Sequence, residues 1–451
     1  MFRVAVVGMG YVGAPLAAVL AEVPGFTVVG VQRRSERSGW KIDFLNKGIS
    51  PYRLEPELGE MLSRAVSRGS LHVTDSFDVC GDADCVIVTA QTPIDEGKRP
   101  RLGNLRQIFA EVGSRLKRGA LVSLASTVPP GTTEGVVKPA LEDACDMEAG
   151  SGFSLVFSYE RVTPGRLVHN IRRLPRVVGG YTPECTARGI EFYRNICLAG
   201  VHGTDIVTAE TTKLVENAYR DVNIAFANEA ALICGCLGVD FHRARALVNS
   251  LPRIEGEPRL NPFRDVHFPG AGVGGHCLPK DPWLLLHGYE AMSDTGFEPR
   301  LIPAARVVND AMPGQVKRLV VEALGEQGVS LCEARIVLLG LGFKGETEDA
   351  RNSPTLALYD LLRHESGDVV VHDPYIEIWE GVPLVHGLDE AVEGRDCLVV
   401  TTRHSVYGEI NLDWLRGVMR RPIIVDGRDV FDPSECRDKG FTYRGIGHAT
   451  R

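Results

Sequence analysis

Short apolar runs alternate with segments of helical periodicity over the first 205 residues of the chain. The runs predicted as strands are residues 4–7, 27–31, 85–90, 121–124 and 155–157. Apolar residues recur at helical spacing in residues 14–21, 105–116 and 133–145. Strands that alternate with helices in this way predict βαβ units and a parallel sheet.

The alternation fades near residue 205 and restarts at residue 335. Residues 208–237 contain no proline and one glycine, and their apolar positions have helical spacing, which predicts a single helix of unusual length. More helical sequence follows, interrupted by a segment rich in proline and glycine at residues 251–275. Strand-like runs then return at residues 336–339, 369–372, 397–401 and 423–425. The domains predicted by this pattern are residues 1–205, 206–312 and 313–451.

Composition and charge narrow the class of protein. With 451 residues, of which 44% are hydrophobic and 24% charged, the chain matches a folded protein of several domains. A net charge of −8 argues against a nucleic-acid partner, because such proteins carry a basic face. The eleven cysteines are odd in number and scattered, which predicts a reducing, cytoplasmic location. No apolar run could span a bilayer and the first strand begins at residue 4, so we expect neither a membrane partner nor a signal peptide.

A glycine loop lies between the first predicted strand and the first predicted helix. In Gly8, Gly10 and Gly13, the first glycine makes a tight turn, the second admits a pyrophosphate and the third allows the helix to pack on the strand. This spacing and context predict dinucleotide binding. The acidic residue expected at the end of the second strand is replaced by Gln32, with two arginines after it. Gln32 can still bond a ribose hydroxyl, whereas Arg33 or its neighbour could receive a 2′-phosphate, so we expect NAD and keep NADP as the alternative.

A second loop of the same spacing, from Gly340 to Gly345, follows the first strand of the last domain. An acidic segment intervenes before Ser353 and Pro354, which have the pattern of an N-cap and a first helical residue. Such a loop is a poor pyrophosphate cradle, so it either binds a nucleotide in another manner or is only a turn. The expected fold class is α/β, with two Rossmann-like doubly wound domains joined by a central helical domain that contains the long helix.

The segment with the most candidate catalytic residues is FPGAGVGGHCLPKDPW, residues 268–283. Its glycines allow the backbone to approach a ligand closely, and Cys277 follows them just ahead of a helix predicted to start at Pro282. The helix N-terminus and the adjacent Lys280 would favour the thiolate, so we predict a nucleophile rather than a buried structural thiol. Asp281 could act as a base or orient a water molecule.

The other ten cysteines mostly lie in apolar runs, and we expect them to be buried as small hydrophobic side chains. Cys234 and Cys236 are close together but have no nearby second pair of ligands. The sequence therefore predicts no metal site.

Lys213, Asn217 and Arg220 share one face of the long helix, because they occupy positions i, i+4 and i+7. Lys213 and Asn217 could donate together to a developing oxyanion, and Lys213 could shuttle a proton if burial lowers its pKa. The alternative is a solvated face on which Glu210 and Glu216 form salt bridges.

Two further loops follow strands of the first sheet, where ligands of open α/β sheets bind. In residues 126–132, Thr127 could position a water molecule. In residues 159–165, Glu160 could be a base and Arg161 could hold an anion. Either loop could equally be ordinary turn chemistry.

Together these motifs resemble those of the UDP-glucose/GDP-mannose dehydrogenase family over essentially the whole chain. The motifs that carry the resemblance are GMGYVG, STVPPGTT, KLVEN, GVGGHCLPKDP and GFKGETEDARNSP. ERVTPG and TTKLVENAYRDVNIAFANE are most similar to the branch that acts on UDP-N-acetylhexosamines, especially UDP-N-acetyl-D-mannosamine. Pro164 stands where the UDP-glucose branch usually has a second acidic residue, which favours the N-acetyl branch.

The resemblance implies an NAD-dependent, four-electron oxidation of the sugar C6 alcohol to a carboxylate, as used in polysaccharide biosynthesis. A thiohemiacetal and then a thioester would form on Cys277. The catalytic residues implied besides Cys277 are Lys213 and Asn217 for oxyanions, with Lys213 also a proton donor or acceptor, Asp281 and Thr127 for water, and Glu160 for acid–base work.

Binding residues are implied by the same match. On the cofactor side they are Gly8, Gly10, Tyr11, Val12, Gly13, Gln32, Thr92, Thr127 and Arg351. On the substrate side they are Arg161, Val162, Lys213, Asn217, Arg220, Gly274, Phe343, Lys344 and Arg428. Arg264 is a stand-in for an arginine that in relatives reaches into the neighbouring subunit's site, and we expect a homodimer or a higher homo-oligomer.

Three alternatives stay open. The substrate could be UDP-N-acetylglucosamine or UDP-glucose. A two-electron hydroxyacid dehydrogenase of similar fold would use the Lys213–Asn217 pair without a nucleophile. A sensor that binds a nucleotide sugar or NAD without turnover would have no need for the Cys277 thiolate.

Overall fold

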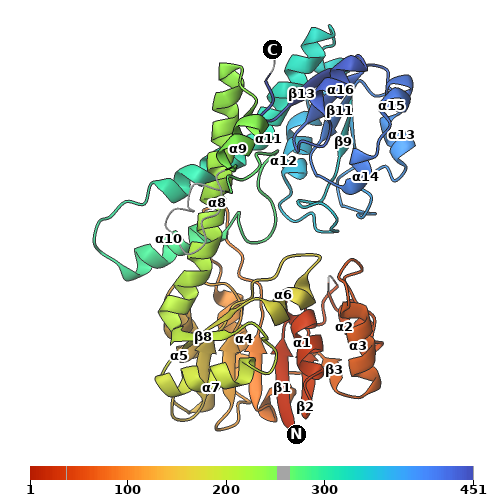
Figure 1. The fold of residues 1–451 in the computed structure, drawn as a ribbon. Coiled ribbons are helices and arrows are strands. Elements are labelled where there is room, and N and C mark those ends of the chain that lie inside the picture. Colours follow the sequence, from red (N-terminus) through yellow and green to blue (C-terminus); the bar gives the residue numbers. More distant parts are fainter. Residues whose placement is uncertain (37, 251–264, 450–451) are drawn as a thin grey trace. The chain divides into compact units, whose positions relative to one another are not determined.

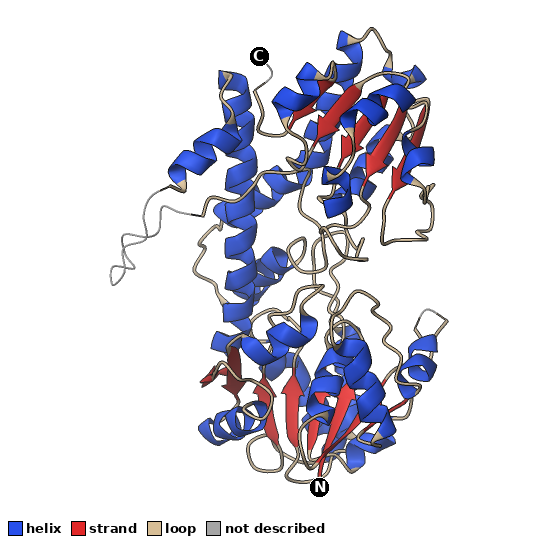
Figure 2. Ribbon diagram, turned by 45° about the vertical axis from the view of Figure 1, so that its right-hand side comes forward, coloured by secondary structure: helices blue, strands red, loops and turns tan. Residues whose placement is uncertain are grey.

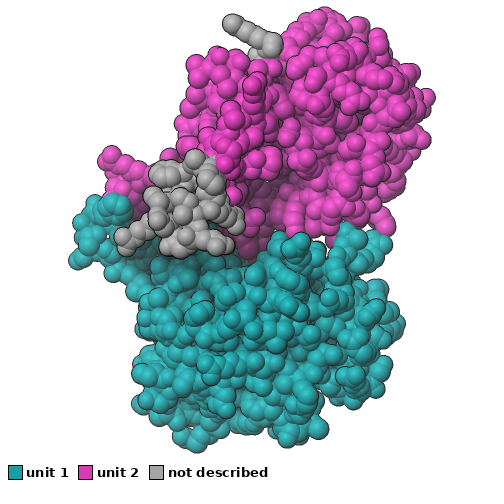
Figure 3. All heavy atoms as spheres, viewed as in Figure 1, with its two compact units in different colours: residues 1–216, 280–297 teal, residues 217–279, 298–451 magenta. Residues whose placement is uncertain are grey.

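The computed structural model describes residues 1–36, 38–250 and 265–449, which form two compact units (Figure 1, Figure 3). Unit 1 comprises residues 1–216 and 280–297. Unit 2 comprises residues 217–279 and 298–451. Among the helices described, none is both long enough and apolar enough to cross a membrane.

Unit 1 is built on an eight-stranded sheet of order β3-β2-β1-β4-β5-β6-β7-β8. Its strands are β1 (Phe2–Val7), β2 (Phe26–Val31), β3 (Leu71–Thr74), β4 (Cys85–Val88), β5 (Leu121–Leu124), β6 (Ser154–Phe157), β7 (Arg176–Gly180) and β8 (Val201–Asp205). The predicted parallel sheet is confirmed for β1–β6, with Val4 in register with both Val28 and Cys85. β7 pairs antiparallel with β6, and β8 follows β7, so the last two strands run in reverse.

Helices cover both faces of this sheet (Figure 2). They are α1 (Gly13–Ala21), α2 (Trp40–Asn46), α3 (Leu58–Ser67), α4 (Gly103–Gly113), α5 (Lys138–Cys145), α6 (Leu167–Arg173) and α7 (Pro183–Tyr193). Unit 1 also contains α10 (Asp281–Met292). Alternate residues of β1 point into two cores: Val4 and Val6 pack with α1, α3, α6 and α7, whereas Ala5 and Val7 pack with α4 and α5. β1 is therefore apolar on both faces, as a strand of a covered parallel sheet must be.

The long helix α8 (Ile206–Leu237) begins in unit 1 and ends in unit 2. The prediction of one helix over residues 208–237 is confirmed. Asp205 fixes its start, because its carboxylate accepts from Thr208 N at 2.8 Å and from the Thr208 hydroxyl. The short helix α9 (Phe241–Val248) follows, capped in the same way by Asp240.

Unit 2 contains a five-stranded parallel sheet of order β10-β9-β11-β12-β13. Its strands are β9 (Arg335–Leu339), β10 (Asp368–His372), β11 (Cys397–Val400), β12 (Ile423–Asp426) and β13 (Thr442–Gly445). Its other helices are α11 (Leu301–Glu326), α12 (Pro354–Leu362), α13 (Leu388–Val392), α14 (Ser405–Gly408), α15 (Leu412–Val418) and α16 (Pro433–Asp438). Here too, alternate residues of the central strand β9 enter two cores, Ile336 and Leu338 on one face and Val337 and Leu339 on the other.

Candidate functional site

The first glycine loop has the geometry of a phosphate cradle. Gly8 follows β1 with φ +101°, and a Cβ at Gly13 would lie 1.8 Å from the Gly8 oxygen, so both positions require glycine. A Cβ at Gly10 would meet nothing within 4 Å, which leaves that side of the loop open. No side chain caps α1, so the N–H of Gly13 at its start is not taken by a capping side chain and can bind an anion.

Gln32 lies beside this loop, as predicted, but its side chain is used to hold the loop. Its Oε1 accepts from Met9 N at 3.0 Å and its Nε2 donates to Ser38 Oγ at 3.1 Å. Arg34 forms an exposed ion pair with Asp75 at 3.1 Å.

Thr92 and Thr127, both predicted on the cofactor side, are joined directly. The Thr92 hydroxyl donates to Thr127 O at 2.6 Å, and Ser126 Oγ donates to Ala90 O at 2.6 Å. These bonds tie together the loops after β4 and β5 at the carboxyl edge of the sheet, where ligands of such sheets bind.

Glu210 on α8 anchors the same loop after β5. Its buried carboxylate accepts from Gly131 N at 2.6 Å, from Thr133 N at 2.8 Å and from Thr133 Oγ1 at 2.6 Å. Burial raises the pKa of Glu210 to about 7, although these donors act in the opposite direction. Glu210 is therefore not the salt-bridge partner of Lys213 that a solvated face would require.

Helix α10 packs on the prolines of this loop. A Cβ at Gly288 would lie 2.2 Å from Pro130 Cδ, so glycine permits this contact. α10 begins at Asp281, one residue before the predicted start at Pro282. Asp281 is fully buried and pairs with the buried Lys280 ammonium. The Lys280 charge that we expected to favour a thiolate at Cys277 is therefore balanced by Asp281.

Lys213 is buried, which excludes a solvated face at this position. Its Nζ donates to Glu160 O at 3.1 Å and lies 5.3 Å from the centre of the Tyr159 ring. The Glu160 carboxylate forms a buried ion pair with Arg176, a residue that the sequence analysis missed. Glu160 is thus placed beside Lys213, and its carboxylate, which we predicted to act as a base, is engaged by the Arg176 guanidinium.

Arg161 is held within unit 1 by three groups. Its guanidinium donates to Glu216 Oε1 at 2.7 Å, to Tyr159 OH at 2.9 Å and to Pro175 O. Arg161, which we predicted to hold an anion, therefore already uses several of its N–H groups within the protein. A guanidinium has five N–H donors, so the others can still bind an anion. Glu216 pairs with Arg161 rather than with Lys213.

In unit 2 the glycine run before Cys277 packs on the second glycine loop. A Cβ at Gly274 would lie 2.6 Å from Phe343 Cβ, and Gly275 has φ +91°. Gly275 N donates to Arg351 O at 2.9 Å, and Asn352 Nδ2 donates to Gly275 O at 3.0 Å. Gly274 and Phe343, both predicted to bind substrate, are thus in contact, and the glycines are required by close approach of neighbouring groups.

Arg428 lies against the same glycine run. Its Nη2 donates to Gly272 O at 3.3 Å and its Nε to Thr401 O at 2.8 Å, and a Cβ at Gly270 would lie 2.4 Å from its Nη1. Asp426 holds the loop that carries it, accepting from Arg428 N at 2.8 Å and from two later amides. Burial lowers the pKa of Arg428 to about 10, which leaves the guanidinium charged at neutral pH.

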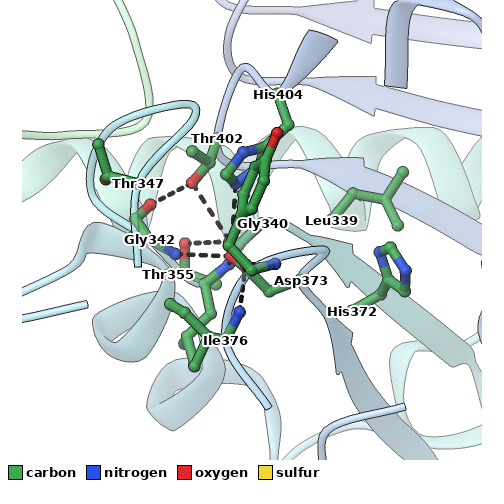
Figure 4. Close-up of polar contacts among 12 residues, drawn as sticks. Leu339, Gly340, Gly342, Thr347, Thr355, His372, Asp373, Ile376, Thr402 and His404 are labelled. Carbon is green, nitrogen blue, oxygen red and sulfur yellow. Dashed lines mark hydrogen bonds and ion pairs between the residues drawn. The ribbon is translucent and has the colours of Figure 1, made fainter. Parts of the chain in front are cut away.

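A polar cluster that the sequence analysis missed supports the second glycine loop (Figure 4). Asp373, at the end of β10, accepts from Leu341 N at 2.7 Å and Gly342 N at 2.9 Å, and the buried His404 lies 3.4 Å from it. Burial acts to raise the pKa of Asp373, but the bonds from His404 and the loop amides outweigh it and lower that pKa. The end of the second strand therefore holds the glycine loop in both units, through Gln32 in one and Asp373 in the other.

Cys277 is exposed in the bend that precedes α10 along the chain. The expectation for the other ten cysteines is correct for the six that are buried, Cys80, Cys85, Cys185, Cys197, Cys397 and Cys436. It is wrong for Cys236 and Cys332, which are exposed, and Cys145 and Cys234 are half-buried. Burial raises the pKa of the Cys80 and Cys436 thiols to about 12, so these thiols are unreactive at neutral pH.

The remaining predicted residues lie as follows. Tyr11, Val12, Val162 and Asn217 are half-buried, whereas Arg220 and Lys344 are exposed. Arg351, predicted on the cofactor side, lies in unit 2 and forms a bidentate pair with Asp349 at 2.8 and 2.6 Å. Arg264 lies outside the described residues.

Comparison with protein families decides what this architecture is. The NAD binding domain of the UDP-glucose/GDP-mannose dehydrogenase family matches residues 2–197, its central domain matches residues 207–311 and its UDP binding domain matches residues 337–433. The chain belongs to this family. Its members that share most of the chain are NAD-dependent UDP-sugar dehydrogenases, so this protein is a nucleotide-sugar dehydrogenase with NAD as its cofactor.

Individual relatives match over the full length. The UDP-N-acetyl-D-mannosamine dehydrogenase of Pyrococcus horikoshii is 37% identical over 445 residues, 99% of each chain. The solved structure of the UDP-D-ManNAc dehydrogenase from that organism has a TM-score of 0.89 and 36% identity, and each chain is fully covered. The NDP-N-acetyl-D-galactosaminuronic acid dehydrogenase of Methanosarcina mazei has a TM-score of 0.86 and 38% identity, covering all of this chain and 96% of that one.

The residues of this family member fit the cofactor. NAD needs an open approach for its pyrophosphate, which Gly10 supplies, and N–H donors, which the uncapped α1 supplies. The family match also confirms the expected fold class of two Rossmann-like domains joined by a central helical domain.

Proposed function

We propose that this dehydrogenase oxidises C6 of UDP-N-acetyl-D-mannosamine to the carboxylate, giving UDP-N-acetyl-D-mannosaminuronate. One observation of the structure supports a four-electron rather than a two-electron reaction. Cys277 presents an exposed thiol at the end of a glycine run that is packed closely on Phe343. A two-electron dehydrogenase would not need a nucleophile there.

The proposed reaction converts the C6 alcohol and one water into a carboxylate, two hydrides and three protons. NAD, when bound, accepts each hydride. Loss of the first hydride and the hydroxyl proton gives an aldehyde, whose carbon the Cys277 thiolate attacks to form a C–S bond and a thiohemiacetal. Loss of the second hydride leaves a thioester, and water then breaks the C–S bond, which frees the thiolate and the carboxylate.

Charged groups on α8 and α10 would serve the proton transfers. The Lys213 ammonium is buried against Glu160 O, where it can stabilise an oxyanion or exchange its proton with the C6 oxygen. Asn217 lies one helical turn further along α8 and can donate to the same oxygen. We propose that Asp281 and Thr127 orient the hydrolytic water, and that Glu160, clamped by Arg176, acts mainly by positioning Lys213.

We propose that the nucleotide part of the substrate binds to unit 2 and the acetamido sugar to its glycine run. The UDP binding domain of the family covers the second glycine loop and Arg428. Phe343, Lys344 and Arg428 offer a ring and two cations for a uracil and a diphosphate. Arg161, Val162, Arg220 and Gly274 would complete the sugar contacts.

Copies of the chain are proposed to form a homodimer through α8. This helix exposes five large apolar side chains at spacings of four and seven residues, Val215, Tyr219, Phe226, Ile233 and Leu237. Such a stripe is typical of a helix that packs against another helix.

Cofactor stoichiometry tests the proposal. Purified protein is incubated with limiting UDP-N-acetyl-D-mannosamine and excess NAD, and NADH is counted per sugar consumed. We expect two NADH per sugar and a uronate product by mass spectrometry. One NADH per sugar would refute the thioester mechanism.

The variant Cys277→Ser should lower kcat by at least about 10³-fold while the affinity for NAD stays unchanged. Cys332→Ser is the matched control, because Cys332 is also an exposed thiol of unit 2. Equal rates for Cys277→Ser and the control would overturn the assignment of the nucleophile.

UDP-N-acetyl-D-galactosamine, whose sugar differs from N-acetyl-D-mannosamine at C2 and C4, is a second candidate substrate. A relative of 38% identity is named for an N-acetyl-D-galactosaminuronic acid, which shares the acetamido group but not the sugar configuration. Ranking kcat/KM over UDP-linked N-acetylmannosamine, N-acetylgalactosamine, N-acetylglucosamine and glucose separates these substrates.

A further inference from the structure

Two histidines and an aspartate that the reaction does not use meet near the C-terminal end of unit 2. His242 is the second residue of α9, Asp429 lies in the loop after β12, and His448 follows β13. His448 is buried, and the side chains of His242 and Asp429 are 13% and 27% exposed. They are brought together by three separate elements.

The three side chains converge on one point. His242 Nδ1 lies 3.3 Å from Asp429 Oδ2, and His448 Nε2 lies 3.0 Å from Asp429 Oδ1. One ligand atom from each residue lies within 4.8 Å of the other two. Tetrahedral zinc with ligands at about 2.0–2.1 Å spaces its ligand atoms about 3.3 Å apart, so little movement would be needed to enclose an ion.

The opposite nitrogen of each ring is already engaged in the way that metal-binding histidines require. His242 Nε2 lies 3.0 Å from Ile446 O, and His448 Nδ1 lies 2.9 Å from Asp240 Oδ2. Both partners are acceptors, so each of these nitrogens carries its proton. The His242 nitrogen that faces Asp429 is then the one with a lone pair, whereas His448 Nε2 hydrogen-bonds Asp429 Oδ1 at 3.0 Å and would have to give up that proton to a metal ion. Carbonyl and carboxylate partners on the opposite ring nitrogen orient metal ligands in this way.

The charges around these residues also favour a bound cation. Nδ1 of His242 faces the Asp429 carboxylate at 3.3 Å and is buried without a hydrogen bond. Asp240 and Asp429 add two negative charges around two imidazoles. A divalent cation among these atoms would be attracted by both carboxylates and would give the buried His242 Nδ1 a partner.

We propose that His242, Asp429 and His448 bind a divalent transition-metal ion, zinc in preference, with water in the remaining position. Two imidazoles and one carboxylate are a ligand set that suits zinc and other late first-row ions rather than magnesium or calcium. The ion would tie the C-terminal segment to α9 and to the loop that carries Arg428. Its role would be structural, because its ligands are not among the residues assigned to the oxidation.

Metal binding to the full-length protein, prepared without a polyhistidine tag, tests the proposal. The protein is treated with a chelator and desalted, and zinc is titrated against a chromophoric zinc indicator. Cobalt is then bound and its visible absorption is recorded. We expect one zinc per chain, removed by excess chelator, and a cobalt spectrum typical of tetrahedral nitrogen and oxygen ligands.

Single substitutions locate the ion. His242→Gln, His448→Gln and Asp429→Asn should each lower zinc affinity by more than about 100-fold. Asn suits position 429 because its backbone has φ 57°. Asp240→Asn keeps a cap for α9 but replaces the carboxylate facing His448, so it should weaken binding by about 10–100-fold. His364→Gln removes an exposed histidine of the same unit and should bind zinc like the wild type.

The competing occupant is a proton on His448 shared with Asp429. In that case, the chelator-treated protein would bind no zinc at micromolar concentration, and the proposal would be overturned. Zinc binding that is equal in His448→Gln and His364→Gln would also overturn it. Because zinc is measured directly, neither result depends on the dehydrogenase activity.

Discussion

Glu210 is the residue on which the loop after β5 depends. Its carboxylate is fully buried and takes three hydrogen bonds from Gly131 and Thr133. This loop carries Thr127, which bonds to Thr92, so one side chain of α8 fixes a segment on the cofactor side of the sheet. A buried carboxylate with a perturbed pKa then makes the stability of unit 1 depend on pH.

The stability of unit 1 should fall as pH rises through about 7, because the pKa of Glu210 is raised from 4.5 to about 7 in the folded chain. Stability from a raised carboxyl pKa is fully present below the unfolded value and is lost as pH passes the folded value. The shift corresponds to at most about 3 kcal/mol. Denaturant unfolding at pH 5 and pH 8 measures this loss.

The variant Glu210→Gln should lose less stability than the wild type between these two pH values. At pH 5 it should be less stable than the wild type, because the NH₂ group of the glutamine side chain would face an N–H donor of the loop. Glu229→Gln on the exposed side of α8 is the control and should keep the wild-type slope. A Glu210→Gln variant with the wild-type slope would show that Glu210 does not titrate in this range.

The sequence could identify candidate residues only where the pattern that marks them lies within a short stretch of the chain. The glycines, Cys277 and Lys213 could be singled out as candidates because they lie in short motifs. Arg176 and the Glu210 anchor were missed, because an ion pair or hydrogen bond between distant segments leaves no spacing to recognise. The same holds for His242 and His448, which are 206 residues apart in the chain but stack at 4.4 Å. The fold also decides which charged groups pair. Glu216 pairs with Arg161, and Lys213 donates to the backbone oxygen of Glu160 instead.

At the scale of elements, α8 combines two tasks along one helix. Three buried polar residues of this helix bond to other elements. Glu210 and Lys213 bond to loops of unit 1. In unit 2, Asp221 accepts hydrogen bonds from Arg306 at 2.6 Å and from Asn309 at 2.9 Å. Its exposed apolar stripe consists of the five side chains named above, Val215, Tyr219, Phe226, Ile233 and Leu237. An exposed apolar stripe of this kind is typical of a surface that packs against another protein surface.

Phe226→Glu should convert the proposed dimer into a monomer, because a carboxylate would replace an aromatic side chain that is 61% exposed in the single chain. Burying that charge at a helix pair is unfavourable by several kcal/mol. Sedimentation velocity over a range of concentrations measures the mass. Glu229→Gln, outside the stripe, should sediment like the wild type, and an unchanged mass for Phe226→Glu would exclude α8 as the interface.

Elements were predictable where periodicity is strong. The strands β1, β2, β4–β6 and β9–β12 and the helix α8 agree with the hydrophobic pattern, and Ser353 with Pro354 begins α12 as expected. β3, β7, β8 and β13 were missed. β8 is the edge strand and exposes more of its residues, so His202 and Gly203 break the apolar pattern that marks a buried strand. β7 is buried but begins with Arg176 and ends with two glycines, which leaves only a short apolar run.

At the scale of the whole chain, each unit has its own pair of hydrophobic cores. Those of unit 1 lie on the two faces of the eight-stranded sheet, and those of unit 2 on the two faces of the five-stranded sheet. A unit with a complete core can unfold on its own. The family match places the NAD binding domain in unit 1 and the UDP binding domain in unit 2, so each unit should respond to its own ligand.

Thermal unfolding should therefore show two transitions, of which NAD raises one and UDP the other. The four tryptophans are divided equally, Trp40 and Trp283 in unit 1 and Trp379 and Trp414 in unit 2. Replacing the pair in one unit by phenylalanine leaves fluorescence that reports the other unit. A ligand at 100 times its Kd adds about 2.7 kcal/mol to the unit that binds it, enough to move that transition by several degrees. If both reporters instead gave one midpoint that NAD and UDP raised equally, the units would unfold as a single cooperative body and the assignment of one ligand to each would lose this support.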